Sequence, residues 1–101
     1  MALDIHRLDN QDYLFGIDDI KFKNLDDIFT AYKHWTGISI NQYDDTRLTI
    51  GDQKTMIKII DDYVKKTNLN QDKAKTTDIL EFRGLLTYFI NNNYDIEFFG
   101  D

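Results

Sequence analysis

The sequence predicts an α+β fold in which three amphipathic helices pack on one face of a small antiparallel sheet. Apolar residues alternate with a period of two near both ends of the chain, which is typical of half-buried strands. Between these ends, three segments repeat apolar residues at intervals of three and four, which is typical of helices. At 101 residues the chain has the length of one domain, and we expect residues 1–101 to form a single domain.

The strands are predicted from alternation and from turn residues. Residues 3–7 and 13–17 alternate, and Asp9-Asn10-Gln11 supplies turn chemistry between them, so the chain is expected to open with a β-hairpin. Tyr94, Ile96 and Phe98 alternate with acidic residues near the other end. They predict a C-terminal strand, which we expect to pair with the hairpin.

The first helix is predicted from an apolar stripe that follows a capping residue. Asn24 has the character of an N-cap, with Asp27 at the third helical position, and Gly37 is well placed to end the helix. The expected inner stripe consists of Leu25, Ile28, Phe29, Tyr32 and Trp35. After it, residues 41–47 form the most loop-like interior segment.

Two further helices follow. The second opens at Thr49 or Gly51 and is expected to break at Asn68-Leu69-Asn70; its core positions are Met56, Ile59, Ile60, Tyr63 and Val64. The third begins between Gln71 and Thr77 and runs to about Ile90. Gly84 lies inside it, where glycine costs about 1 kcal/mol relative to alanine, so we expect close packing against another element there.

Composition restricts the possible partners and the compartment. The formal net charge of −6 argues against nucleic acid and against anionic membrane surfaces, and it suits a basic protein partner. The chain has no cysteine, which favours the cytoplasm, since small secreted domains often rely on disulfides. Residues 1–7 lack a basic segment followed by an apolar run, so no signal peptide is expected.

The residues that enzymes need are scarce. Ser39 is the only serine, and no glycine-flanked elbow surrounds it. His6 and His34 are the only histidines and do not have metal-ligand spacing. Phosphate-binding glycine loops and calcium loops are absent from the sequence. We therefore expect no catalytic residues, no metal, no cofactor and no enzymatic activity.

The acidic residues carry the remaining signal, because they form four Asp-Asp pairs. Helix physics accounts for two pairs: residues 26–27 in the first turn of a helix, and residues 61–62 four positions before two lysines. Residues 18–19 are partly explained as a strand end. Residues 44–45 follow an aromatic residue in a loop, and no cap or ion pair accounts for them. An aromatic beside acids is a reasonable anchor for a basic partner.

The candidate partner-binding residues are Tyr43, Asp44, Asp45, Asp61, Asp62, Tyr94, Asp95 and Glu97. Asp61 and Asp62 join the others only if the second helix lies beside them.

The general character of the chain resembles that of bacterial toxin-immunity proteins. The stretch from Ile79 to Leu86 reads as a helix, and residues 95–101 read as a short strand ending in Gly-Asp, with a similar style in a small acidic chain without cysteine. The resemblance implies a cytoplasmic inhibitor that binds and neutralises a cognate basic toxin, such as a nuclease. It matches no individual positions, so no site residues follow from it.

Other functions are compatible with the same residues. One class comprises other interaction modules: a phage-encoded host inhibitor, a nucleic-acid mimic or a regulatory adaptor. Another is a structural or assembly subunit, in which exposed aromatic residues drive self-association. The identity of the partner separates the first class from an immunity protein, and concentration-dependent sedimentation reveals the second.

Overall fold

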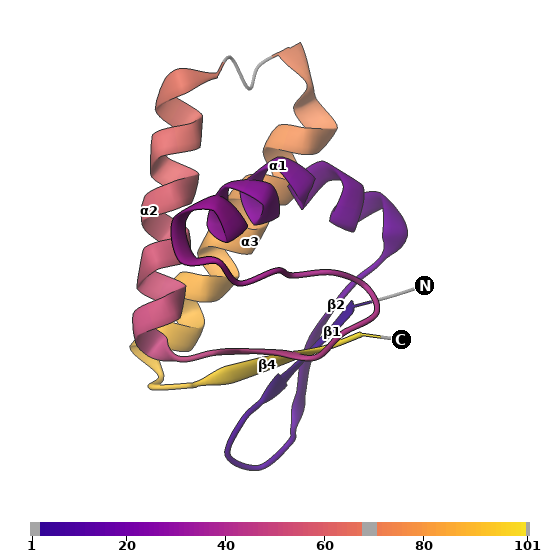
Figure 1. Cartoon of the computed structure of the whole chain (residues 1–101), viewed down its shortest axis with the longest axis vertical. Coiled ribbons are helices and arrows are strands. Elements are labelled where there is room, and N and C mark those ends of the chain that lie inside the picture. The colour runs from indigo at the N-terminus through magenta and orange to yellow at the C-terminus, as the bar shows by residue number, and fades with distance from the viewer. Residues whose placement is uncertain (1–2, 68–70, 101) are drawn as a thin grey trace.

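The computed structural model describes residues 3–67 and 71–100 and has the predicted α+β architecture (Figure 1). Four strands form one antiparallel sheet in the order β2-β1-β4-β3. The elements are β1 (Leu3–Arg7), β2 (Tyr13–Ile17), α1 (Asp19–Thr36), β3 (Thr46–Leu48), α2 (Ile50–Lys66), α3 (Lys73–Asn91) and β4 (Ile96–Phe99). The predicted helix break at residues 68–70 lies outside the described residues.

The last strand completes the sheet as expected. β1 and β2 form the hairpin, and β1 also pairs with β4, so that Ile5 lies opposite Phe98. β3 was not predicted: residues 46–48 were expected to belong to a loop or to the residues before a helix, yet they pair with β4 through Thr46 and Phe98. Three residues are too few to show a period-two alternation, so only the pairing with the distant β4 identifies this segment as a strand.

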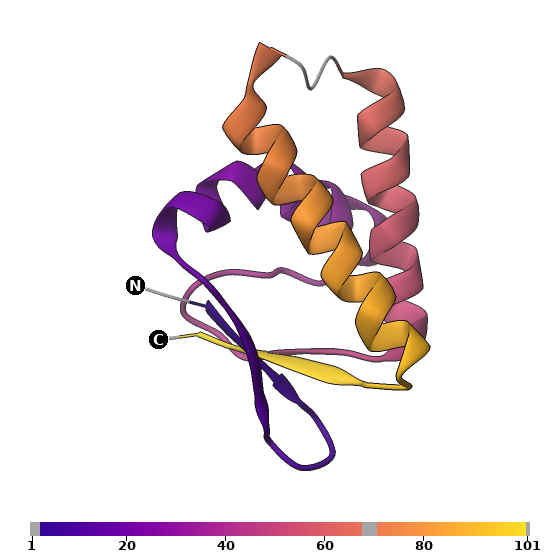
Figure 2. The ribbon, with the colours of Figure 1, turned by 180° about the vertical axis from the view of Figure 1, so that it is seen from behind.

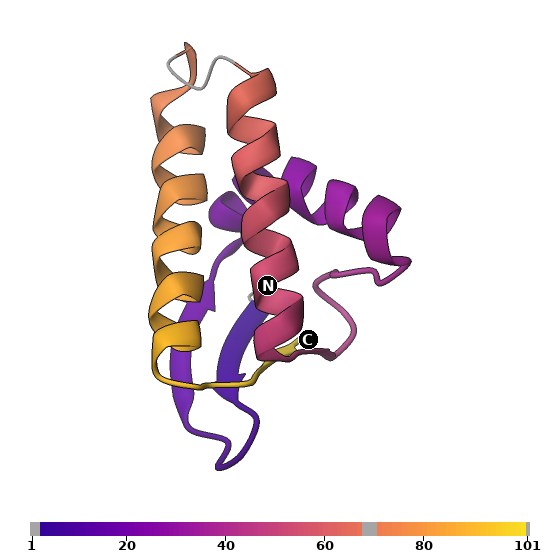
Figure 3. The ribbon, with the colours of Figure 1, turned by 90° about the vertical axis from the view of Figure 1, so that its left-hand side faces the viewer.

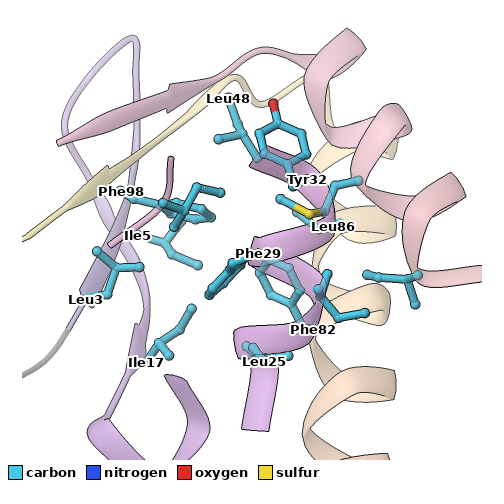
Figure 4. Packing of buried hydrophobic residues seen from close by; sticks show 14 of the residues in the cluster. Leu3, Ile5, Ile17, Leu25, Phe29, Tyr32, Leu48, Phe82, Leu86 and Phe98 are labelled. Atoms are coloured by element: carbon cyan, nitrogen blue, oxygen red, sulfur yellow. The ribbon is translucent and has the colours of Figure 1, made fainter. Parts of the chain in front are cut away.

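The core fills the space between one face of the sheet and the three helices (Figures 3 and 4). Leu3 and Ile5 alternate inward from β1, and Ile96 and Phe98 do so from β4; all four are fully buried. Figure 4 shows the rings of Phe29, Phe82 and Phe98 gathered between the sheet and the helices. Apolar burial on this face is the main stabilising term of the fold.

Helix α1 begins earlier than the sequence predicted. Its N-cap is Asp18, whose carboxylate accepts a hydrogen bond of 2.8 Å from the backbone N–H of Lys21. The predicted cap, Asn24, lies inside the helix and donates to Asp78 instead. Asp26 and Asp27 are therefore not in the first turn. Gly37 ends the helix as predicted, with a left-handed φ of 79°.

Two predictions about residues packed inside the fold were wrong. Trp35, expected in the inner stripe of α1, is 58% exposed because it lies in the last turn, beyond the buried Tyr32. Gly84, expected to pack closely, is exposed, and a Cβ built on it would meet nothing within 4 Å. Its cost within α3 is therefore not offset by a close contact.

We expect Gly84→Ala to raise the free energy of unfolding by about 0.5–1 kcal/mol, because alanine has the higher helix propensity and restricts the unfolded chain. Urea unfolding monitored by circular dichroism measures the change. The matched control is Gly37→Ala, which should destabilise the protein because Gly37 has a positive φ. A loss of stability in Gly84→Ala would show that its exposed position tolerates no side chain.

The other helix ends agree with the sequence. Thr49 caps α2 in a capping box with Asp52, one of the two starts expected for this helix. Asp72 caps α3 by accepting from the backbone N–H of Lys75 at 3.0 Å. Beyond α3, Asn93 has a left-handed φ of 59°, a conformation that asparagine adopts more readily than most residues.

One polar cluster joins all three helices. Asp27 of α1 accepts hydrogen bonds from the hydroxyl of Tyr63 on α2 at 2.7 Å and from the ammonium of Lys75 on α3 at 2.6 Å. These two donors hold the pKa of Asp27 below its usual value, since both favour the charged carboxylate. The same contacts raise the pKa of Lys75.

We expect the protein to lose stability in acid, in part through Asp27. A carboxyl group whose pKa is lowered by folding stabilises the folded state above its unfolded pKa of about 4. That contribution is lost as the pH falls through the folded pKa. Unfolding free energies at pH 7 and pH 3 should therefore differ less in Asp27→Asn than in the wild type. The control is Asp26→Asn, which leaves the cluster intact; an equal change in both variants would contradict the assignment.

Candidate functional site

The candidate site is sought on the surface, because no pocket is found among residues 3–67 and 71–100. Within the same residues, no three histidine or acidic side chains converge as metal ligands. None of the described helices combines the length and apolarity needed to cross a membrane. The surface features that could bind a partner are the predicted acidic residues and the exposed aromatic residues near them.

The loop that carries Tyr43, Asp44 and Asp45 has a defined conformation set by Asn41. The Asn41 side-chain oxygen accepts from the backbone N–H groups of Tyr43 at 2.8 Å and Asp44 at 3.0 Å. Its amide nitrogen donates to the Asp44 carboxylate at 3.1 Å. This arrangement is typical of an Asx turn. It leaves the Tyr43 side chain 66% exposed.

Two longer-range hydrogen bonds attach this loop to the rest of the fold. Gln42 donates from its side chain to the Asp19 carboxylate at 2.9 Å, which ties the loop to the start of α1. The backbone N–H of Gly100 donates to the Asp45 carboxylate at 3.2 Å, which ties it to the end of β4. In Figure 1 the segment after α1 runs back along the helix before it turns into β3.

Gly100 allows this close approach because it has no side chain. A Cβ at this position would lie 2.7 Å from the backbone nitrogen of Asp44 and from the carbonyl carbon of Tyr43. It would also lie 2.8 Å from the carbonyl oxygen of Gln42. All three contacts are with backbone atoms, which cannot rotate aside as a flexible side chain can.

We therefore expect Gly100→Ala to displace the loop and to destabilise the protein by about 1–3 kcal/mol, the usual cost of overpacking. Urea unfolding measures the cost, and amide chemical shifts of residues 42–45 report the displacement. The control is Gly51→Ala, where the added Cβ meets only the Thr49 hydroxyl at an ordinary 3.7 Å. Unchanged shifts in Gly100→Ala would mean that the backbone contact is absent in solution.

These contacts bring two Asp-Asp pairs from distant parts of the sequence into one region. We call this region, formed by Asp18, Asp19, Tyr43, Asp44 and Asp45, the acidic corner. Among the described residues, none of the ion pairs involves Asp18, Asp44 or Asp45. The sequence indicated Tyr43, Asp44 and Asp45 but gave no reason to join them to residues 18–19, because Gln42 supplies that link through tertiary structure.

The predicted residues near β4 have structural roles away from the acidic corner. Asp95 accepts a hydrogen bond from the backbone N–H of Ile50 at 2.8 Å, at the start of α2. The Tyr94 ring lies beneath the guanidinium of Arg7, 4.2 Å from the ring centroid. Both residues precede β4, whereas Gly100 follows it.

Glu97 lies within β4 and pairs with Arg47 on the neighbouring strand at 3.7 Å. Its side chain is 13% exposed, so little of its carboxylate faces solvent. Glu97 therefore adds little to an accessible acidic surface.

Asp61 and Asp62 lie on α2 and are engaged within the helical layer. Asp61 forms two hydrogen bonds with Arg83 of α3, at 2.8 and 3.3 Å, in place of the predicted pair with Lys65. These hydrogen bonds lower the pKa of Asp61. Asp62 pairs with Lys66 at 3.0 Å, as predicted. Asp61 is therefore attached to α3, and Asp62 to Lys66 within α2 itself, so neither belongs to the acidic corner.

Comparisons with protein-family models, with curated proteins and with solved structures give no significant match to this chain.

Proposed function

We propose that the chain is an immunity-type inhibitor that binds a basic protein, such as the nuclease domain of a cognate toxin, through the acidic corner. The observation that carries the proposal is the hydrogen bond from Gln42 to Asp19, which ties the loop of the exposed Tyr43 and of Asp44-Asp45 to the start of α1, where Asp18-Asp19 lie. The net charge of −6 adds a long-range attraction for a basic surface, which speeds association.

The conformation of the loop supports this proposal in a second way. Asn41, Gln42 and Gly100 fix its backbone before any partner arrives, so little ordering entropy is lost on binding. Tyr43 supplies a rigid aromatic surface of the kind that anchors many interfaces. The flanking carboxylates pair with lysine and arginine side chains of the partner and so orient it on this surface.

The experiment compares two variants that each lose two charges. Asp44→Asn with Asp45→Asn keeps acceptor oxygens for Asn41 and Gly100 while it removes the charges of the loop. The matched control, Asp26→Asn with Asp72→Asn, removes two exposed charges elsewhere, and asparagine preserves the cap of α3. A basic domain captured from cells that make the chain is purified, and its association is followed at several salt concentrations.

We expect the loop variant to lower the association rate constant about three- to tenfold and to flatten its salt dependence. The control should behave like the wild type. Equal rates for the loop variant and the wild type would exclude the acidic corner as the binding surface. Loss of the captured domain's toxic activity on binding distinguishes an immunity protein from an adaptor or another inhibitor.

A second candidate function is self-assembly, which the outer face of α3 favours. Leu80 is 50% exposed and Tyr88 is 56% exposed, and Gly84 lies between them at intervals of four residues. These positions form a stripe without charge on one side of a helix. A sedimentation coefficient that rises with concentration in the wild type, and not in Leu80→Ser, would support this candidate.

A further inference from the structure

β2 is the less protected of the two edges of the sheet. The other edge, β3, has three residues, and one of them is the exposed Arg47. β2 has five residues, Tyr-Leu-Phe-Gly-Ile, without a charge among them. An edge strand presents unpaired backbone N–H and C=O groups, and natural edges are usually short or charged to prevent pairing with other chains. β3 follows that pattern, whereas β2 does not.

Acidic residues stand immediately before and after this uncharged strand. Asp12 precedes β2 and Asp18 follows it, and both are exposed. The nearby cations are already engaged: Arg7 binds Asp9 through two hydrogen bonds of 3.0 and 2.7 Å, and Lys21 binds Glu81 at 3.0 Å. Both ends of the β2 edge therefore carry negative charge.

The same acids disfavour a second copy of the chain as the occupant of this edge. If two β2 strands paired antiparallel about Phe15, Asp12 of each copy would lie opposite Asp18 of the other. Like charges directly opposite each other destabilise a strand pair.

We infer that β2 accepts an extended segment of a protein partner that carries a lysine or arginine at each end of an uncharged stretch. Strand addition provides backbone hydrogen bonds, and the two basic residues would meet Asp12 and Asp18. These acids are six positions apart, a span of about 20 Å in an extended chain. Because both ends of β2 carry the same charge, the segment fits in either direction.

Tyr13 adds a side-chain contact beside the edge. Its ring is 60% exposed, and its hydroxyl lies over Gly16, 2.6 Å from where a Cβ would stand. The hairpin that carries β2 projects beyond the helices, as Figure 2 shows, so its turn end is accessible. The assignment of the segment to a basic protein rests on the proposed function, although the edge itself does not.

The test uses a peptide and the complete chain. A seven-residue peptide, acetylated and amidated, carries lysine at both ends and alternating threonine and valine between them. It is titrated into the isotope-labelled protein while amide chemical shifts are recorded. We expect saturable shifts confined to residues 12–18, with a dissociation constant below about 1 mM. The control peptide, with glutamate at both ends, should not bind.

Two variants of the chain sharpen the result. Asp12→Asn with Asp18→Asn should lower the affinity for the lysine peptide about fivefold, because it removes both flanking charges. Asparagine is chosen because it preserves the cap of α1. Asp26→Asn with Asp72→Asn should leave its affinity unchanged. Shifts outside β2, equal binding of the two peptides, equal weakening by both variants, or no saturable shift would each overturn the inference.

The β2 site and the acidic corner share Asp18, but their tests give separate outcomes. The titration contains no toxin and leaves Asp44 and Asp45 unchanged, so its failure removes the β2 site alone. Conversely, a captured partner whose association ignores Asp44→Asn with Asp45→Asn removes the acidic corner as the binding surface and leaves the peptide result intact.

Discussion

Phe98→Ala is expected to reduce the free energy of unfolding by about 3–5 kcal/mol, the usual cost of truncating a buried phenylalanine. Phe98 is fully buried on an interior strand of the sheet, and its ring centroid lies 6.3 Å from that of Phe29 and 6.4 Å from that of Phe82. The cavity would open where the sheet meets α1 and α3. Such a loss is a large part of the about 5–15 kcal/mol that keeps a small domain folded.

The matched control is the next residue of the same strand. Phe99 points to the opposite face of the sheet, where it is half-buried and packs edge-on against His6 at 4.7 Å. Phe99→Ala should cost less than about 2 kcal/mol, because its ring is only partly buried in the folded protein. Urea unfolding of both variants measures the difference. Equal costs for the two variants would contradict the arrangement in which the helices cover one face of the sheet and leave the other uncovered.

The sequence was a good guide where a pattern is long and local. The hairpin, the three helices and the last strand each repeat apolar residues over several positions, and all of them are present. It failed where a tertiary contact decides the outcome. Residues 18–19 read as a strand end, yet Asp18 caps α1 and Asp19 is its first residue. Asn24, the predicted cap, bonds to Asp78 on α3 instead.

The candidate site shows the same division. The Tyr43–Asp45 loop was found because no cap or ion pair in the sequence accounted for its acids. Its connection to Asp19 through Gln42, across 23 positions, has no local signal. The same holds for the acids that proved to have internal partners: Asp95 bonds across 45 positions to Ile50, and Asp61 bonds across 22 positions to Arg83. The distance along the chain, and not the residue type, made these contacts unpredictable.

A buried amide that sequence reasoning overlooked joins two connections of the fold. Gln53 on α2 is fully buried and donates from one nitrogen to the carbonyl of Leu48 at 3.2 Å and to that of Tyr94 at 2.8 Å. It thereby links the end of β3 to the segment before β4. Its own side-chain oxygen is buried without a hydrogen-bond partner among the described residues. The residue therefore contributes two bonds and carries one desolvation cost.

Gln53→Leu measures the balance between the two hydrogen bonds that the side chain donates and the desolvation cost of its oxygen. Two carbonyls would lose their donor, at about 1–3 kcal/mol for each buried group left unsatisfied, while removal of the unpartnered oxygen returns part of that cost. We expect a net loss of about 2–4 kcal/mol in urea unfolding. Met56→Leu, an apolar exchange in the same buried layer of α2, should cost less than about 1.5 kcal/mol. If Gln53→Leu proves as stable as the wild type, the desolvation cost of the oxygen equals the stabilisation from both hydrogen bonds. In that case the backbone pairing of β3 with β4 alone holds these strands together.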